Sequence, residues 1–153
     1  MTRAPRGATG CWDGGDEPLP DTDIGLFRTA CWEAARRVRG RVEEVSLPGG
    51  VRSFHVAALV GHGDPHVVVC HAHLPSVAFL GEPPVPGRPL SRFADPPPWS
   101  DVFEHAGLRP LPVEYLATPM SRVDVSELAD AELRQMRYWR PEVLGDLLFN
   151  WWD

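Results

Sequence analysis

The sequence predicts an α+β fold, in which an N-terminal helix and two C-terminal helices cover a mostly antiparallel sheet of three to five strands. Two observations carry this prediction. One apolar stripe with helical spacing lies near the start of the chain, and short segments rich in β-branched residues follow it, separated by glycine and proline. With 153 residues and 43% hydrophobic content, the chain is long enough for one domain with a substantial core.

The first part of the chain divides into an arm and a helix. Residues 1–20 combine glycine and proline with little apolar periodicity, so we predict a flexible arm ahead of a single domain over 21–153. Asp21 or Thr22 can cap the helix, and Gly40 can take the left-handed conformation that ends it. Its apolar stripe consists of Ile24, Phe27, Cys31, Ala34, Ala35 and Val38.

The next part predicts an antiparallel meander. Glycine and proline in "PGG" and "GHGDP", and Pro75, supply the backbone conformations of tight connections. Valine and other β-branched or aromatic residues dominate the segments between them. We predict strands over 41–47, 51–60 and 66–73, with a possible fourth over 76–80.

Residues 81–99 contain seven prolines, which neither a helix nor a central strand accommodates, so they predict a long surface loop. Loops of this length are often functional. A short helix is expected between Ser100, as its cap, and Gly107, as its stop. We interpret "PVEYLA", residues 112–117, as a strand.

The last third predicts two helices. Asp124 and Glu127 have capping-box spacing, which predicts a helix from there to about Trp139. Pro141 ends that helix and suits the first turn of a second one that runs to the C-terminus. At 100° per residue, Leu147, Leu148 and Trp151 share a core-facing stripe with Val143 and Leu144. Phe149 and Trp152 fall on nearly the opposite side, together with Gly145.

Composition limits the function classes. The net charge of −6 argues against a general nucleic-acid binder, and no apolar run is long enough to span a membrane. Three cysteines without metal-type spacing, and no signal-peptide core, indicate a cytoplasmic protein with reduced thiols. All fifteen basic residues are arginine, which we attribute to a high-GC bacterial genome rather than to phosphate binding.

A histidine and cysteine cluster is one candidate site. If 66–73 is a strand, His71 and His73 project from one face, ~7 Å apart, and could bind a divalent metal such as zinc with His55 as a third ligand. The alternative is that both merely occupy the polar face of a half-exposed strand. Cys70 could form a nucleophilic pair with His55 across the strands, or be a small buried core residue.

Aromatic residues form the other candidate. Phe149 and Trp152 could be buried by another element, or could join Tyr138 and Trp139 in a patch that meets a partner or a second copy. Trp99, after three prolines, is a further exposed aromatic candidate.

These observations favour a small cytosolic, non-enzymatic protein-binding module with no cofactor, which uses an acidic surface and an aromatic patch. In general terms only, it resembles bacterial immunity or accessory proteins that act by binding a partner. Two alternatives remain. The chain could be a metal-binding protein or enzyme centred on the histidine and cysteine cluster, or a small-molecule pocket protein of a biosynthetic pathway.

Overall fold

The structure is a computed structural model that describes residues 1–44, 52–61, 63, 65–90 and 92–152. It has the predicted α+β class, with a mostly antiparallel sheet and five α-helices among the described residues. The helices are α1 (Ile24–Arg37), α2 (Asp101–His105), α3 (Val113–Leu116), α4 (Asp130–Trp139) and α5 (Leu144–Leu148). Two 3-10 turns, η1 (Pro98–Ser100) and η2 (Met120–Arg122), accompany them.

The main sheet is built around the predicted meander. Its hydrogen-bonded order is β2 (Arg41–Glu44), β3 (Phe54–Val60), β4 (His66–His71), β5 (Ser76–Leu80) and β6 (Phe93–Ala94), all antiparallel. A sixth strand, β7 (Arg109–Pro110), pairs with β5 in parallel. The second half of the strand predicted over 41–47 lies outside the described residues.

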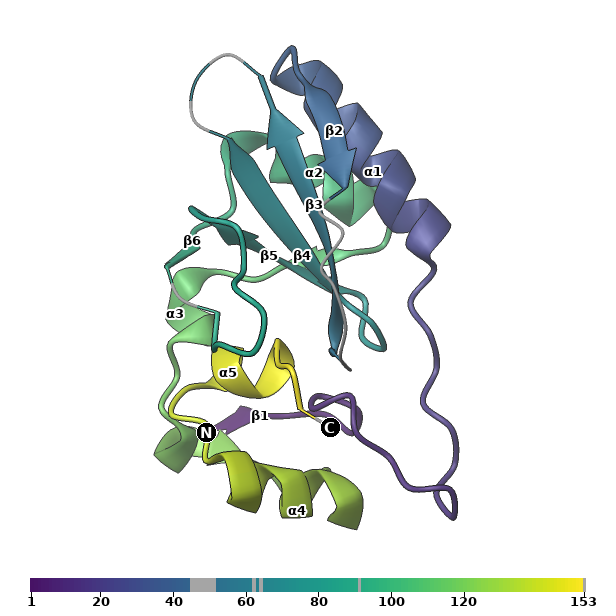
Figure 1. The fold of residues 1–153 in the computed structure, drawn as a ribbon, viewed down its shortest axis with the longest axis vertical. Helices are drawn as coiled ribbons and strands as arrows, with labels where there is room; N and C mark the ends of the chain where they lie inside the picture. Colours follow the sequence, from purple (N-terminus) through teal and green to yellow (C-terminus); the bar gives the residue numbers. More distant parts are fainter. Residues whose placement is uncertain (45–51, 62, 64, 91, 153) are drawn as a thin grey trace.

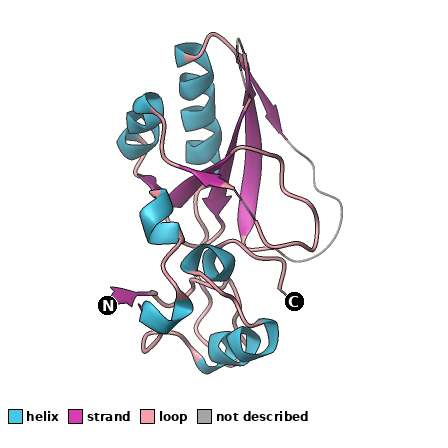
Figure 2. Ribbon diagram, turned by 90° about the vertical axis from the view of Figure 1, so that its left-hand side faces the viewer, coloured by secondary structure: helices cyan, strands magenta, loops and turns pink. Residues whose placement is uncertain are grey.

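The two faces of this sheet carry separate cores. The helix-side core packs the apolar faces of α1 and α2 on the sheet, through buried residues such as Phe27, Cys31, Leu59, Phe79 and Phe103. Figure 2 shows both helices along that face of the sheet. The terminus-side core covers the other face with α5, the C-terminal tail and the N-terminal segment. Its buried residues include Ala8, Phe54, Val69, Leu147, Phe149 and Trp152.

Helix α1 matches the prediction in extent but not in its end residues. Its N-cap is Asp23, whose Oδ1 accepts hydrogen bonds from the amides of Gly25 and Leu26 at 2.9 and 3.3 Å. The left-handed residue at its end is Arg39, with φ of 54°, rather than Gly40. Gly40 is needed for another reason, since a Cβ there would lie 2.2 Å from the carbonyl oxygen of Val60.

Two predictions between residues 112 and 139 are wrong. Residues 113–116 form helix α3 and not a strand, because the Val113 amide donates to Asp95 Oδ1 and Ala117 closes a helical turn onto Val113. Asp124 does not open α4, which begins at Asp130. Its side chain instead accepts from the Ser126 amide, and Val123–Asp124 is strand β8.

The last helix is shorter than predicted. It ends at Leu148, and Phe149 has an extended backbone (φ −118°, ψ 92°). The Asn150 side-chain amide donates to the carbonyl oxygen of Leu147 at 2.8 Å and so replaces the continuing helix. The helical projection therefore does not apply after residue 148. Phe149 is fully buried and Trp152 is 7% exposed.

The segment predicted to be a flexible arm is packed in its first half. Strand β1 (Thr2–Arg3) pairs in parallel with β8, and Ala4 and Ala8 are fully buried in the terminus-side core. Both chain ends therefore lie at the same end of the molecule (Figure 1). No helix in the described part of the chain is long and apolar enough to cross a membrane.

Candidate functional site

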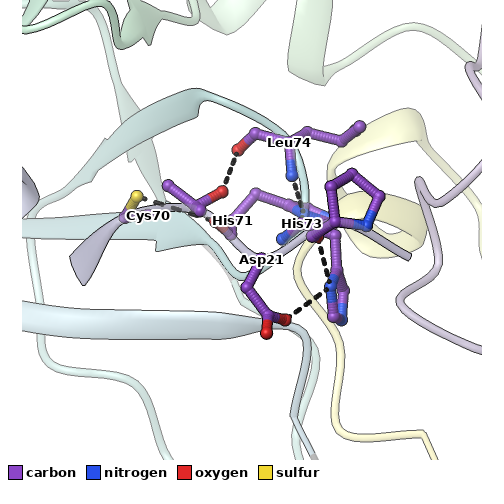
Figure 3. A network of polar contacts seen from close by, with 7 residues as sticks. Asp21, Cys70, His71, His73 and Leu74 are labelled. Atoms are coloured by element: carbon purple, nitrogen blue, oxygen red, sulfur yellow. Dashed lines mark hydrogen bonds and ion pairs between the residues drawn. The ribbon is translucent and has the colours of Figure 1, made fainter. Parts of the chain in front are cut away.

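His71 is a structural residue in this fold. Strand β4 ends at His71, so His73 lies in the following turn and the strand alternation expected for an H-x-H pair stops there. The ring Nε2 of His71 lies 2.8 Å from the carbonyl oxygen of Ala8, to which it can only donate. Nδ1 accepts from the amides of His73 and Leu74 at 3.0 and 3.1 Å, in the turn that Figure 3 shows.

These contacts assign the protonation state of His71. Burial lowers its pKa to about 4, against the opposing effect of the hydrogen bond to Ala8, so the ring is neutral at pH 7. Because backbone groups use both ring nitrogens, a metal ion could bind His71 only by displacing them. His73 makes different contacts, with the carbonyl oxygen of Pro20 at 3.0 Å and Asp21 Oδ1 at 3.5 Å.

His55 and Cys70 are direct partners across β3 and β4, as the alternative of a nucleophilic pair requires. Strand alternation places them on the face opposite to His71, so the three histidines do not converge. Cys70 is fully buried, and burial raises its pKa to about 12, which keeps the thiol protonated. Among the described residues, no group of three or more His, Cys, Asp or Glu side chains could hold a metal ion.

A buried polar cluster, which the sequence does not reveal, joins the N-terminal segment to α4 and the C-terminal tail. Oε1 of the fully buried Glu132 accepts from the Gly7 amide, the Thr9 amide and the Thr9 hydroxyl at 3.0, 3.1 and 2.8 Å. Asn150 donates from its side chain to the Thr9 carbonyl oxygen at 2.9 Å. The partners are mostly backbone groups, which leave no sequence signal.

The aromatic residues form a groove. A cavity of about 500 Å³ opens between the proline-rich segment, the turn after α4 and the C-terminal tail. We call it the aromatic groove. Its walls are mainly large apolar side chains, and the residues that line it are Gly87, Pro89, Leu90, Trp139, Arg140, Pro141, Glu142, Val143, Asp146, Phe149, Asn150, Trp151 and Trp152.

Local hydrogen bonds position these walls. The Trp139 indole donates to Gln135 one turn earlier on α4, and the Trp151 indole donates to the Arg88 carbonyl oxygen, which joins the tail to the proline-rich segment. Arg140 takes a left-handed conformation (φ 52°) that ends α4 and turns the chain toward α5. Asp146 then accepts from two amides of that turn at 3.2 and 3.3 Å.

The structure brings three of the five predicted binding residues together. Trp139, Phe149 and Trp152 all line the aromatic groove, and the Trp139 and Trp152 rings are parallel within 3°, with centroids 6.4 Å apart. Tyr138 lies beside Trp139, is 75% exposed and is outside the groove lining. Trp99 is elsewhere, against Phe79 and His66 on the helix side of the sheet.

The lining of the groove is mainly apolar. Its lining contains no histidine, cysteine or serine among the described residues, and its Asp146 carboxylate is engaged in the turn before α5. Aromatic and proline side chains offer apolar area with little conformational entropy to lose. No protein-family model, curated protein or solved structure matches this chain.

Proposed function

We propose that this protein is a non-enzymatic binding module whose aromatic groove receives an extended apolar segment of a partner protein. The observation that carries the proposal is the wall of Trp139, Phe149, Trp151 and Trp152 around one open cavity. Tryptophan and tyrosine are enriched among the residues that dominate binding energy at protein interfaces. Grooves lined by aromatic side chains bind extended peptides, especially in the polyproline II conformation.

The length of the concave surface favours a peptide over a compact small molecule. Trp152 also lines a second hollow of about 370 Å³, together with Trp12 and Gln135. Two hollows that share one tryptophan form a surface along α4, with exposed aromatic rings at Trp139 and Trp12, which are 43% and 45% exposed. An extended segment can occupy both hollows at once.

The charge of the chain favours a basic partner. The net charge is −6, and Glu142 and Asp146 outnumber Arg140 among the charged residues that line the groove. Long-range attraction would increase the association rate of a basic partner and would weaken with salt. We place this activity in the cytoplasm, which is supported by the three free cysteines Cys11, Cys31 and Cys70.

A peptide-display selection against the purified protein tests the proposal. We expect the selected peptides to carry apolar residues with nearby arginine or lysine, and to bind Trp139→Ala and Trp12→Ala at least tenfold more weakly, as is usual for interface hot spots. Trp32→Ala is the matched control, because Trp32 is 58% exposed on α1 and lines neither the aromatic groove nor the second hollow.

Equal binding by the wild-type protein, Trp139→Ala and Trp12→Ala would contradict the proposal, as would selected peptides that only Trp32→Ala fails to bind. Self-association through the same groove is a distinct outcome. Sedimentation velocity would detect it as a dimer that Trp139→Ala dissociates and Trp32→Ala does not.

A further inference from the structure

A further cavity, which shares no lining residue with the aromatic groove, lies where the start of β5 meets β7, α3 and the N-terminal segment. It has a volume of about 510 Å³, and we call it the β7 pocket. This volume is within the range of small-molecule sites. Its apolar lining consists of Pro5, Leu74, Pro75, Leu111 and Leu148. Leu74 belongs to the turn after β4 that Figure 3 shows.

The charges around the β7 pocket are unevenly balanced. Arg3 lines it but lies 3.5 Å from Glu127 and 3.6 Å from Asp124, so two carboxylates compensate this guanidinium group. Arg109 lines the pocket too, and no aspartate or glutamate of the described residues forms an ion pair with it. Because the carboxylates around Arg3 exceed its charge, an anion gains only where it contacts Arg109 directly.

Arg109 is held in position from two sides. Its guanidinium carbon lies 5.2 Å from the centroid of the Tyr115 ring, within the range of a cation–π interaction. Its amide donates to the carbonyl oxygen of Pro75 at 2.8 Å, which fixes β7 beside the start of β5. A contact with the face of a ring leaves guanidinium N–H groups able to bond to an acceptor. The exposed Arg109 side chain is therefore oriented and still able to donate.

Two hydroxyl groups add neutral hydrogen-bonding capacity to the lining. Ser76 begins β5 and Tyr115 lies on α3, and neither side-chain oxygen makes a hydrogen bond within the described part of the chain. Each hydroxyl can donate one hydrogen bond and accept others. The β7 pocket thus combines one unpaired cation and two hydroxyls with an apolar surface, and a few polar groups in an apolar hollow are typical of ligand sites.

We infer that the β7 pocket binds a small organic acid, with its carboxylate at Arg109 and its apolar body against Leu74, Leu111 and Leu148. A guanidinium group matches the geometry of a carboxylate and forms strong, charge-assisted hydrogen bonds with it. One unpaired positive charge suits one negative charge, whereas a phosphate monoester would bring a second negative charge toward Glu127. This site is separate from the aromatic groove and does not depend on a partner protein.

A pair of isosteric probes tests this inference in a ligand-observed NMR titration. 3-Phenylpropionate carries a carboxylate where the neutral 3-phenylpropionamide carries an amide, on the same apolar body. At pH 7 we expect the wild-type protein to bind the acid about tenfold more tightly than the amide, as a charge-assisted hydrogen bond predicts. The net charge of −6 repels anions in general, so this preference reports a local site. It should fall several-fold between about 0.05 and about 0.5 M NaCl, because salt screens the exposed guanidinium group.

Matched variants assign the preference to the β7 pocket. Arg109→Met removes the charge but keeps an unbranched side chain, and we expect it to bind the acid about tenfold more weakly and the amide unchanged. Arg109→Lys keeps the charge without the planar fork and should retain part of the preference. Arg137→Met is the control, because it removes the same charge from an exposed position on α4 outside the pocket lining.

Four results would overturn the inference. The first is equal affinity of the wild-type protein for the two probes, and the second is an equal loss of acid binding in Arg109→Met and Arg137→Met. The third is tighter binding of 2-phenylethyl phosphate than of 3-phenylpropionate. The fourth is loss of the preference in Trp139→Ala but not in Arg109→Met, which would place the acid in the aromatic groove. Because the Arg109 side chain is exposed, thermal unfolding of Arg109→Met should match that of the wild type.

Discussion

The two faces of the sheet are covered by different kinds of chain. On the helix side, α1 and α2 provide an almost entirely apolar layer. On the terminus side, the cover consists of short helices, the C-terminal tail and the N-terminal segment, and it involves all the buried polar side chains of the described residues: Thr9, Ser53, His71, Glu132 and Asn150.

This difference follows from backbone hydrogen bonding. A helix satisfies its own amides and carbonyls except at its ends, so its buried face can be wholly apolar. An irregular segment leaves amides and carbonyls that need partners when they are buried. Glu132, Asn150 and His71 supply those partners for residues 7–9. Polar side chains in this core therefore stabilise irregular chain and need no catalytic explanation.

Deleting residues 2–11 should have the largest effect on stability, because this segment is part of the terminus-side core. The deletion would leave Glu132, the Nε2 group of His71 and the side-chain amide of Asn150 without their partners at residues 7–9. At about 1–3 kcal/mol for each of these three buried groups left unpaired, we expect the protein to lose at least about 3 kcal/mol of its free energy of unfolding. Urea unfolding followed by circular dichroism measures this loss. An unchanged urea midpoint of unfolding would mean that residues 2–11 do not contribute to the stability of the terminus-side core.

Glu132→Ala should have the next largest effect. It removes the acceptor of four hydrogen bonds, from the amides of Gly7, Thr9 and Ala129 and the hydroxyl of Thr9, and leaves the three donors of Gly7 and Thr9 buried. We expect a loss of roughly 3–5 kcal/mol. Glu132→Gln keeps one oxygen as an acceptor and should lose less.

Glu127→Ala is the control for Glu132, because Glu127 forms a surface ion pair with Arg3 at 3.5 Å and such pairs contribute little. If Glu132→Ala and Glu127→Ala unfolded at the same urea concentration, the proposed role of the buried carboxylate would be refuted.

The pH dependence of stability tests the role of His71 in the terminus-side core. The pKa of His71 is lowered from 6.5 to about 4, so the unfolded chain takes up a proton at a higher pH than the folded protein does. Stability from this group is therefore complete above about pH 6.5 and is lost progressively as the pH falls toward 4, by roughly 3 kcal/mol in all. Unfolding free energies at pH 7.5 and 4.5 measure it.

His71→Gln has no titrating ring at this position, so we expect it to be less stable than the wild type at pH 7.5 and to show a smaller loss on acidification. Other groups contribute equally to both proteins, and the difference between their pH profiles isolates His71. Parallel profiles would mean that His71 is accessible to protons in the folded state.

The smallest expected effect is on the helix side. Asp23→Ala removes the side chain that accepts from the amides of Gly25 and Leu26 at the start of α1, and should cost about 1 kcal/mol. Asp23→Asn keeps a capping oxygen and should be close to the wild type. Because the end of α1 is solvent-exposed, water can replace the cap. A loss as large as that of Glu132→Ala would remove the distinction between the two faces.

The helix-side face could be predicted from the sequence because its signals are local. The spacing of Phe27, Cys31 and Ala34 identifies one face of α1, and the glycines and prolines between the strands identify the meander. Only the residues at the two ends of α1 differ from the prediction. Asp23 is the N-cap and Arg39 takes the left-handed conformation, and neighbouring residues could also have filled these roles.

The terminus-side face could not be predicted in the same way. Glu132 accepts from the Thr9 amide and Asn150 donates to the Thr9 carbonyl oxygen, both more than a hundred residues away, and no residue type reveals a backbone partner. The aromatic groove was predicted in part. Trp139, Phe149 and Trp152 were candidates by composition, but burial of Phe149 depends on the end of α5 at Leu148, which the Asn150 side chain determines.

The hydrogen bond between Thr9 and Asn150, which joins residues 141 positions apart, has a consequence for the order of folding. The β3–β5 meander and α1 involve neighbouring parts of the chain, so their contacts close short loops and can form early. The terminus-side core is complete only when residues 7–9 and 147–152 have both packed against the sheet. We expect its docking to be a late step, and the residues of the aromatic groove to become ordered with it.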